Sequence, residues 1–159
     1  MSTPETAVPT HKPKQIDPRG PRVAAAFTSI LLAVTIVVAL TGQNVAALIL
    51  LAVIVVLFAL GAAGSPAYPW SLVFTKLIRP RLAPPAQTED AAPPRFALVV
   101  GLIITGIGLI GGLAGIQLAV PVAAGFAFVA AFLNASIGFC LGCEIYGLIV
   151  RVRTASSRN

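Results

Sequence analysis

The sequence predicts an all-α membrane protein of four transmembrane helices arranged as two hairpins, with an interfacial amphipathic helix between helices two and three. Hydrophobic residues make up 57% of the chain and charged residues only 10%, whereas a soluble domain carries about 25% charged residues. No charged residue occurs from Val23 to Thr75 or from Phe96 to Cys143. A membrane crossing needs roughly 20 helical residues. Each uncharged stretch therefore holds two crossings and a short turn.

A polar, Pro-rich tail, residues 1–21, precedes the first helix and is expected to be disordered, because it has little apolar surface to bury. It does not resemble a cleavable signal peptide. The four-helix transmembrane domain is predicted over residues 22–153, and a short cytoplasmic tail over 154–159. Polar turns and Gly-Ser-Pro or Gly-containing breaks separate the helices. The predicted transmembrane helices cover residues 23–40, 45–63, 96–115 and 118–139.

The segment 68–82 between the second and third helices differs in kind from the four long helices. Its aromatic and aliphatic residues share one helical face, and its polar residues lie opposite. Trp and Tyr with nearby cations are typical of a helix in the headgroup plane. A Pro- and Ala-rich linker, 83–94, follows it.

Glycines recur at four-residue spacing in the second hairpin, as Gly108/Gly112, Gly111/Gly115 and Gly138/Gly142. Small residues at this spacing let helix backbones approach closely. We expect them to pack helices within one molecule; the alternative is a homo-oligomer joined through the Gly-rich helices.

All eleven Lys and Arg residues lie outside the predicted membrane crossings and their two short turns. Because positive residues stay on the cytoplasmic side, we expect a multi-pass protein of the plasma membrane with both termini in the cytoplasm. The basic residues then face lipid phosphates, and a nucleic-acid partner is not expected. They are Lys12, Lys14, Arg19 and Arg22, then Lys76, Arg79, Arg81 and Arg95, and finally Arg151, Arg153 and Arg158.

A short repeat opens the two hairpins. Asp17 is followed by Pro21-Arg22-Val23-Ala24, and Asp90 is followed at the same spacing by Pro94-Arg95-Phe96-Ala97. Two like hairpins would be related by an axis along the membrane normal, as in some transporters. A shared way of starting a helix explains so short a match equally well.

Few residues offer chemistry. The predicted helices carry no ionisable residue in mid-membrane, so an ion-coupled carrier lacks its usual group. Their Ser, Thr and Asn side chains are expected to form local hydrogen bonds. His11 is the one histidine, which excludes a His-based metal site. The G-x-G-x-x-G pattern of Gly106, Gly108 and Gly111 lies inside a membrane helix and predicts no nucleotide site. No cofactor and no metal are predicted.

The candidate site is Cys140-x-x-Cys143, which contains both cysteines of the chain. Such a pair can form a reversible disulfide, exchange thiols or carry a persulfide, with the adjacent Glu144 as a modulator. Two alternatives remain: small packing residues, or half of a metal site shared between two chains. A helix four that continued to Val150 would place the thiols near its negative end. A break at Gly138 or Gly142 would place them at a helix N-terminus, which favours the thiolate.

Four segments carry a resemblance to a known family. They are Asp17-Pro18-Arg19-Gly20-Pro21-Arg22, Ser65-Pro66, Pro94-Arg95-Phe96-Ala97 and the segment from Gly138 to Tyr146. Together they resemble domain of unknown function 4395, a family of small bacterial, often actinobacterial, membrane proteins, over roughly residues 16–153. The family has no established activity. Its members often lie beside genes for a thioredoxin-like protein and a rhodanese-type sulfurtransferase, which implies redox or sulfur metabolism by association.

Three functions fit these observations. The first is a membrane thiol or sulfur-relay module whose Cys140 and Cys143 exchange with a cytosolic thioredoxin-like or sulfurtransferase partner. The second is a small permease or transporter component for a sulfur-containing anion such as thiosulfate. The third is a structural or assembly subunit of a larger membrane complex. A stand-alone enzyme is not expected.

Overall fold

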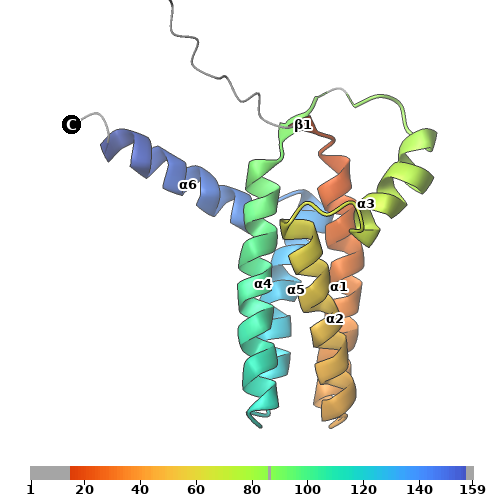
Figure 1. Ribbon diagram of the computed structural model, residues 1–159, viewed down its shortest axis with the longest axis vertical. Coiled ribbons are helices and arrows are strands. Elements are labelled where there is room, and N and C mark those ends of the chain that lie inside the picture. Colours follow the sequence, from red (N-terminus) through yellow and green to blue (C-terminus); the bar gives the residue numbers. More distant parts are fainter. Residues whose placement is uncertain (1–14, 86, 157–159) are drawn as a thin grey trace, which may run out of the picture.

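The computed structural model describes residues 15–85 and 87–156. Four long helices run side by side and alternate in direction: α1 (Arg19–Leu40), α2 (Asn44–Ala62), α4 (Ala92–Leu113) and α5 (Ala119–Ile137). The turns after α1 and α4 lie together at one end of the bundle (Figure 1). All four helices are long and apolar enough to cross a membrane.

The shorter elements and a last helix gather at the opposite end (Figure 1). Strand β1 (Gln15–Ile16) pairs antiparallel with β2 (Glu89–Asp90). Helix α3 (Pro69–Val73) continues into a π-helical turn, η1 (Phe74–Ile78), and a 3₁₀ turn, η2 (Arg79–Arg81). Helix α6 (Leu141–Ser156) projects outward from the bundle.

Several boundaries differ from the sequence prediction. Helices α1 and α4 begin at Arg19 and Ala92, before their Pro-Arg pairs, because a proline in the first helical turn gives up no intrahelical hydrogen bond. The predicted interfacial helix 68–82 is not one regular helix. Pro80 has no N–H for the carbonyl four residues earlier, and the backbone widens into the π turn ahead of it.

The predicted tails also differ. Residues 15–21 form β1, a two-residue connection and the start of α1, and β2 supplies the hydrogen-bond partners of β1. At the other end, α6 extends to Ser156. The expected disorder of residues 1–14 lies outside the described residues, as do His11, Lys12, Lys14 and Arg158.

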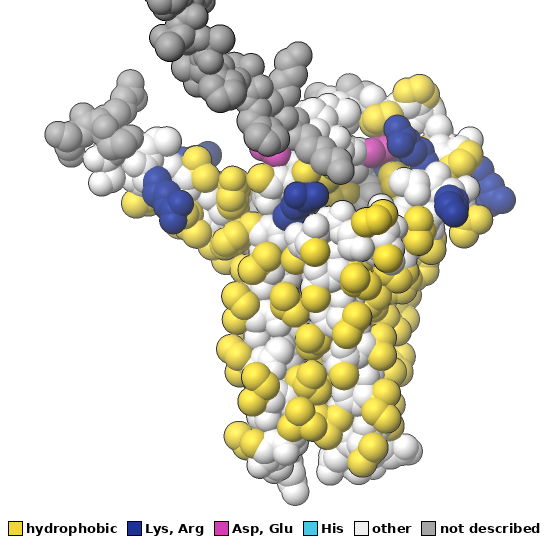
Figure 2. Space-filling model, viewed as in Figure 1, with side chains coloured by type: hydrophobic (Ala, Val, Ile, Leu, Met, Phe, Trp, Pro, Cys, Tyr) yellow, Lys and Arg dark blue, Asp and Glu magenta, His cyan; other side chains and the backbone are white. Residues whose placement is uncertain are grey.

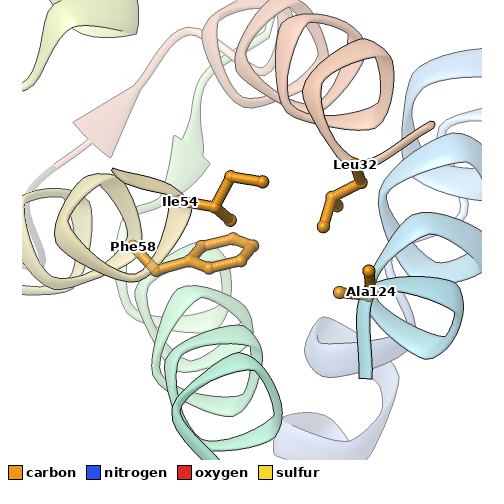
Figure 3. Packing of buried hydrophobic residues seen from close by; sticks show 5 residues of the cluster. Leu32, Ile54, Phe58 and Ala124 are labelled. Atoms are coloured by element: carbon orange, nitrogen blue, oxygen red, sulfur yellow. The ribbon is translucent and has the colours of Figure 1, made fainter. Parts of the chain in front are cut away.

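The centre of the bundle is packed with buried apolar side chains from α1, α2 and α5, and partly buried side chains of α4 pack against them (Figure 3). Leu32 of α1, Ile54 of α2 and Ala124 of α5 are at most 1% exposed and contact one another in one cluster with Phe58. A second cluster, Ala47, Leu51 and Val120, lies nearer the turns. The most extensive packing joins α1 to α5 and α2 to α4, so each early helix is held chiefly by a late one.

The outer surface of the bundle is as apolar as its interior. Large side chains such as Ile30, Ile107 and Phe126 are 61–67% exposed. Figure 2 shows hydrophobic side chains down the length of the bundle, with Lys and Arg only at the end that carries α3 and α6. A water-soluble bundle exposes polar residues on this outer face; an apolar outer face is compatible with lipid.

The two halves of the chain repeat the same order of elements. Each has a short strand, a long helix, a turn, a second long helix, a left-handed glycine and an outward-projecting segment. The turn glycines, Gly42 and Gly115, have φ values of 81° and 85°, and the glycines after the second helices, Gly64 and Gly138, have 66° and 72°.

Hydrogen bonds repeat as well. Asp17 Oδ1 accepts from the Arg19 N–H at 3.0 Å, and Asp90 Oδ1 accepts from the Ala92 N–H at the same distance. The packing of α1 on α5 is the counterpart of that of α2 on α4, which corresponds to an approximate two-fold axis along the bundle. The repeat thus reaches far beyond the helix starts. This favours duplication of an ancestral hairpin over a shared way of starting a helix.

Candidate functional site

The chain between α5 and α6 turns sharply, and this break decides where the cysteines lie. Gly138 ends α5 in the left-handed conformation, φ 72°, which glycine adopts without strain. Its N–H donates to the Asn134 carbonyl at 3.1 Å, and the next N–H, of Phe139, donates to the Leu133 carbonyl at 3.3 Å. Of the two geometries that the sequence left open, the structure has the broken one, with the break at Gly138.

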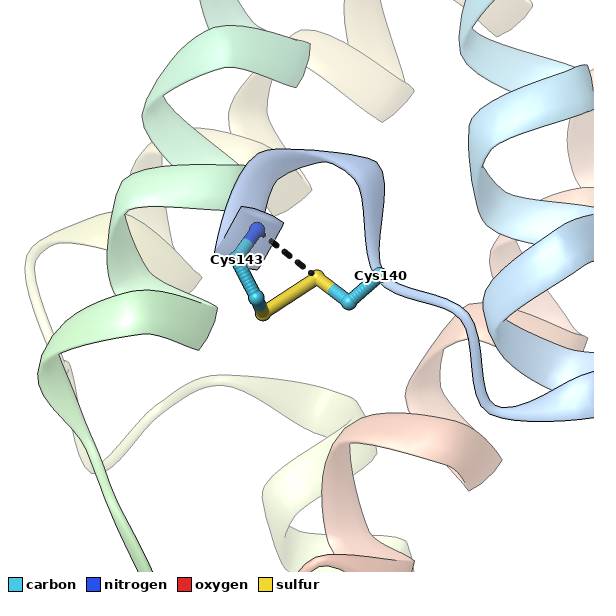
Figure 4. Close-up of a disulfide and its surroundings, with 2 residues drawn as sticks. All are labelled: Cys140 and Cys143. Carbon is cyan, nitrogen blue, oxygen red and sulfur yellow. Dashed lines mark hydrogen bonds between the residues drawn. A yellow bond between two sulfur atoms is a disulfide. The ribbon is translucent and has the colours of Figure 1, made fainter. Parts of the chain in front are cut away.

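Cys140 and Cys143 therefore lie at the N-terminus of α6, and their sulfur atoms form a disulfide (Figure 4). Their Cα atoms are 5.2 Å apart. Cys140 precedes the first helical residue, and the Cys143 N–H donates to the Cys140 sulfur at 3.4 Å. The Cys140 sulfur thus occupies the place of an N-cap acceptor, where the positive end of the helix favours negative charge. Both cysteines are partly exposed.

Glu144 also lies in the first turn of α6, and its side chain is exposed. Its backbone N–H donates to the Cys140 carbonyl at 3.1 Å. A carboxylate here stabilises the helix start, but it also adds negative charge beside the sulfur atoms. The role of Glu144 as a modulator stays a prediction.

Two contacts dock the start of α6 on α4. Gly142 is buried, and a Cβ there would lie 2.5 Å from the Cα and Cβ of Ala97. One helical turn on, the Tyr146 ring packs against Phe96 with centroids 5.7 Å apart. These contacts hold the disulfide beside the first turns of α4.

Two arginines that sequence reasoning did not assign lie on the left-handed glycines. The guanidinium of Arg22 in α1 covers Gly138, and that of Arg95 in α4 covers Gly64. Each arginine thus reaches across to the corner of the other half. The shared Pro-Arg pair was the sequence signal, but it does not tell where the side chain ends.

The corner of the first half carries different chemistry. After Gly64 the chain continues Ser65-Pro66, with no cysteine. Tyr68 packs on Gly61, where a Cβ would lie 3.1 Å from its ring. Burial raises the pKa of Tyr68, so its phenol stays protonated and neutral. Only the second corner offers a group that can exchange electrons among the described residues.

The Ser and Thr side chains of the long helices bond to their own backbone, as expected. Thr28, Thr35 and Thr105 donate to the carbonyl four residues earlier at 2.7–2.8 Å. Ser29 and Ser136 make similar local bonds. Within residues 15–85 and 87–156, no group of three His, Cys, Asp or Glu side chains could hold a metal ion.

Gly108, Gly111 and Gly112 of α4 pack against neighbouring helices of the same molecule, whereas a Cβ added at Gly115 would have no atom within 4 Å. A Cβ on Gly108 would overlap that of Ala123 in α5, and one on Gly111 would lie 2.7 Å from that of Ala119. Gly112 faces Val120 and Leu48. Close packing within the chain is confirmed at these positions; association of copies stays a prediction.

A family model described as a domain of unknown function (DUF4395) matches residues 16–151. No curated protein and no solved structure matches the chain.

Proposed function

The chain belongs to the DUF4395 family, and we propose that it is an integral membrane protein whose Cys140–Cys143 pair exchanges electrons with a cytosolic dithiol protein. The observation that carries this proposal is the disulfide at the N-terminus of α6. A helix N-terminus favours a thiolate, the reactive form of cysteine.

Membrane placement is supported by the four apolar helices and by the distribution of charge. The cations of the described residues lie at the end of the bundle that carries α3 and α6, and the opposite turns hold none (Figure 2). By the positive-inside rule this end faces the cytoplasm. The two halves then cross the membrane as two hairpins with both termini inside.

The exchange follows ordinary thiol–disulfide chemistry. A partner thiolate attacks the Cys140 sulfur, the bond to Cys143 breaks, and Cys143 leaves as a thiolate that takes up a proton. The partner's second thiolate then attacks the partner's first sulfur in the mixed disulfide. Cys140 is released as a thiolate, which α6 stabilises and which exchanges its proton with the solvent. Two electrons and two protons pass from the partner dithiol to the cysteine pair.

A protein of the thioredoxin-like class supplies such a dithiol. The cytosol keeps its thiols reduced, so a disulfide exposed there is a substrate rather than a permanent brace. A rhodanese-type sulfurtransferase, the other partner considered, would transfer sulfur to the reduced pair and leave a persulfide on Cys140.

The structure gives less support to a permease. Leu32, Leu51 and Ile54 fill the middle of the bundle and are at most 1% exposed. A recess of about 170 Å³ opens at the end opposite the cysteines, between the turns, and no charged side chain lines it. An anion pathway through one molecule would need these core side chains to separate.

The exchange can be tested with the two single-serine variants of the full chain in detergent. The probe is a thioredoxin-type protein that keeps one active-site cysteine, activated as its mixed disulfide with thionitrobenzoate. We expect Cys143→Ser to release the chromophore through Cys140 and to form an adduct that dithiothreitol reverses. Cys140→Ser should react at least about tenfold more slowly, because Cys143 lacks the N-cap position.

The double variant, Cys140→Ser with Cys143→Ser, provides the baseline. If both single variants react no faster than this baseline, the cysteines are packing residues, and a structural or assembly role remains for the protein. Equal rates of the two single variants would refute the assignment of Cys140 as the cysteine that forms the mixed disulfide with the partner.

A further inference from the structure

Helix α6 presents an apolar stripe that nothing in the described chain covers. Leu141, Ile145, Leu148 and Val152 follow one another at helical spacing and are 37–63% exposed. They lie beside the face that docks on α4 through Gly142. A stripe at this spacing is the buried face of an amphipathic helix, so a partner surface is missing.

The projecting end of the stripe carries positive charge. Arg151 and Arg153 are exposed and flank Val152 on its two sides. Glu144 is the one acidic residue of the helix, and it lies at the docked end near the cysteines. The projecting end of α6 therefore combines an apolar face with a net positive rim.

The corresponding part of the first half has the same character. The segment from α3 to η2 projects outward at the same end of the bundle (Figure 1). It exposes Leu72 and Leu77, 39% and 58%, beside Lys76, Arg79 and Arg81. Trp70 stacks on Phe27 with centroids 5.0 Å apart and ties this segment to α1, as Tyr146 and Phe96 tie α6 to α4.

We propose that α6 is a binding site for anionic phospholipids and lies in the headgroup layer of the cytoplasmic leaflet, with its stripe toward the acyl chains. The inference rests on the membrane placement proposed above. Apolar residues with flanking cations bind an anionic bilayer surface. Both projecting segments lie at the cationic end of an apolar bundle, where the headgroups of a surrounding bilayer would be.

Lipid binding would also fix the cysteines. Because Cys140 and Cys143 begin the helix that binds lipid, the disulfide would be held at the membrane surface. A cytosolic partner could then reach it without entering the bilayer.

Fluorescence of a single tryptophan in the full chain tests this placement. In a Trp70→Phe background, tryptophan is introduced as Leu148→Trp on the stripe, or as Val150→Trp nearly opposite, and each protein is placed as one copy per lipid nanodisc. Brominated phosphatidylglycerol should quench the tryptophan at 148 about twofold more than that at 150. Aqueous iodide should show the reverse order. Val34→Trp in mid-α1 reports insertion of the bundle.

The role of charge is tested with Arg151→Gln and Arg153→Gln. Each substitution should lower the equilibrium constant for binding of α6 to the lipid surface about fivefold. Replacing phosphatidylglycerol by phosphatidylcholine should have a similar effect. Equal access of iodide to positions 148 and 150, with position 34 still quenched by lipid, would overturn this inference and leave the proposed function intact. The apolar stripe would then be a binding surface for a protein. A water-exposed position 34 would overturn the membrane placement itself.

Discussion

Arg22 and Arg95 show how single residues join the two halves. Each guanidinium lies on a left-handed glycine at the C-terminus of a helix from the other half. Helix C-termini carry partial negative charge, and a cation there is stabilising by about 0.3–1 kcal/mol. The two arginines thus have equivalent structural roles. Only Arg22, however, lies beside the turn that leads to Cys140.

This difference permits a matched comparison. We expect Arg22→Gln to make the Cys140 thiolate less stable relative to the thiol, because a positive charge near the reduced site is lost. In the reduced Cys143→Ser protein, the pH midpoint of Cys140 alkylation should lie below the free value of about 8.5 and should rise when Arg22 is replaced. Alkylation rates with iodoacetamide across pH measure this midpoint.

Arg95→Gln is the control, since the Arg95 guanidinium lies on Gly64, at the corner that carries no cysteine. Both substitutions should lower the thermal stability similarly, but only Arg22→Gln should move the midpoint. A shift of the same size in both variants would mean that Arg22 acts through stability alone.

At the scale of elements, small residues determine how α4 meets its neighbours. Gly108 allows α4 to approach Ala123 of α5, whereas Gly106, on the same helix, has no atom within 4 Å of a Cβ added to it. The G-x-G pattern that resembles a nucleotide motif thus contains one packing glycine and one that is free of contacts.

Gly108→Ala should therefore destabilise the protein by about 1–3 kcal/mol, the usual cost of overpacking. Gly106→Ala should be neutral or stabilising by up to about 1 kcal/mol, because alanine is the better helix former. Unfolding of the purified chain in mixed detergent micelles, followed by circular dichroism, measures both. Equal destabilisation by the two alanines would contradict the close α4–α5 contact.

For the whole molecule, the approximate two-fold axis and the charge distribution lead to the same topology. Both halves place their strands, corners and projecting segments at one end, and the described cations lie there (Figure 1 and Figure 2). Each juxtamembrane Lys or Arg near anionic lipid contributes about 1 kcal/mol. Because all act in the same sense, we predict that this end of the bundle faces the cytoplasm.

We expect a membrane-impermeant maleimide to leave Cys140 and Cys143 unlabelled in intact, reductant-treated cells. Opening the cytoplasmic face should allow labelling of the reduced pair. A Gln43→Cys variant on a Cys140→Ser, Cys143→Ser background supplies the positive control, since Gln43 lies exposed in the turn at the other end. Labelling of the native cysteines in sealed cells would show that the orientation is the reverse of the predicted one. It would also contradict the proposed exchange with a cytosolic partner.

The apolar helices and their number could be predicted from the sequence, because membrane crossings depend on local composition and length rather than on contacts. The family resemblance and the candidate pair Cys140–Cys143 could also be read from it. The helix starts were placed too late, because a proline in the first turn is as acceptable inside a helix as before it. Residues 15–21 were assigned to a disordered tail, because their partner strand lies far along the chain.

Only the tertiary structure decided which backbone conformation the cysteine segment adopts. Both an unbroken helix and a break at Gly138 satisfy the local sequence, since glycine permits either backbone. The break exists where Arg22 covers Gly138 and where Gly142 and Tyr146 dock on α4. These contacts join residues distant in sequence, and the free energy that selects one backbone over the other comes from them. Composition determined that the helices form, and packing between the halves determined that the disulfide begins a helix.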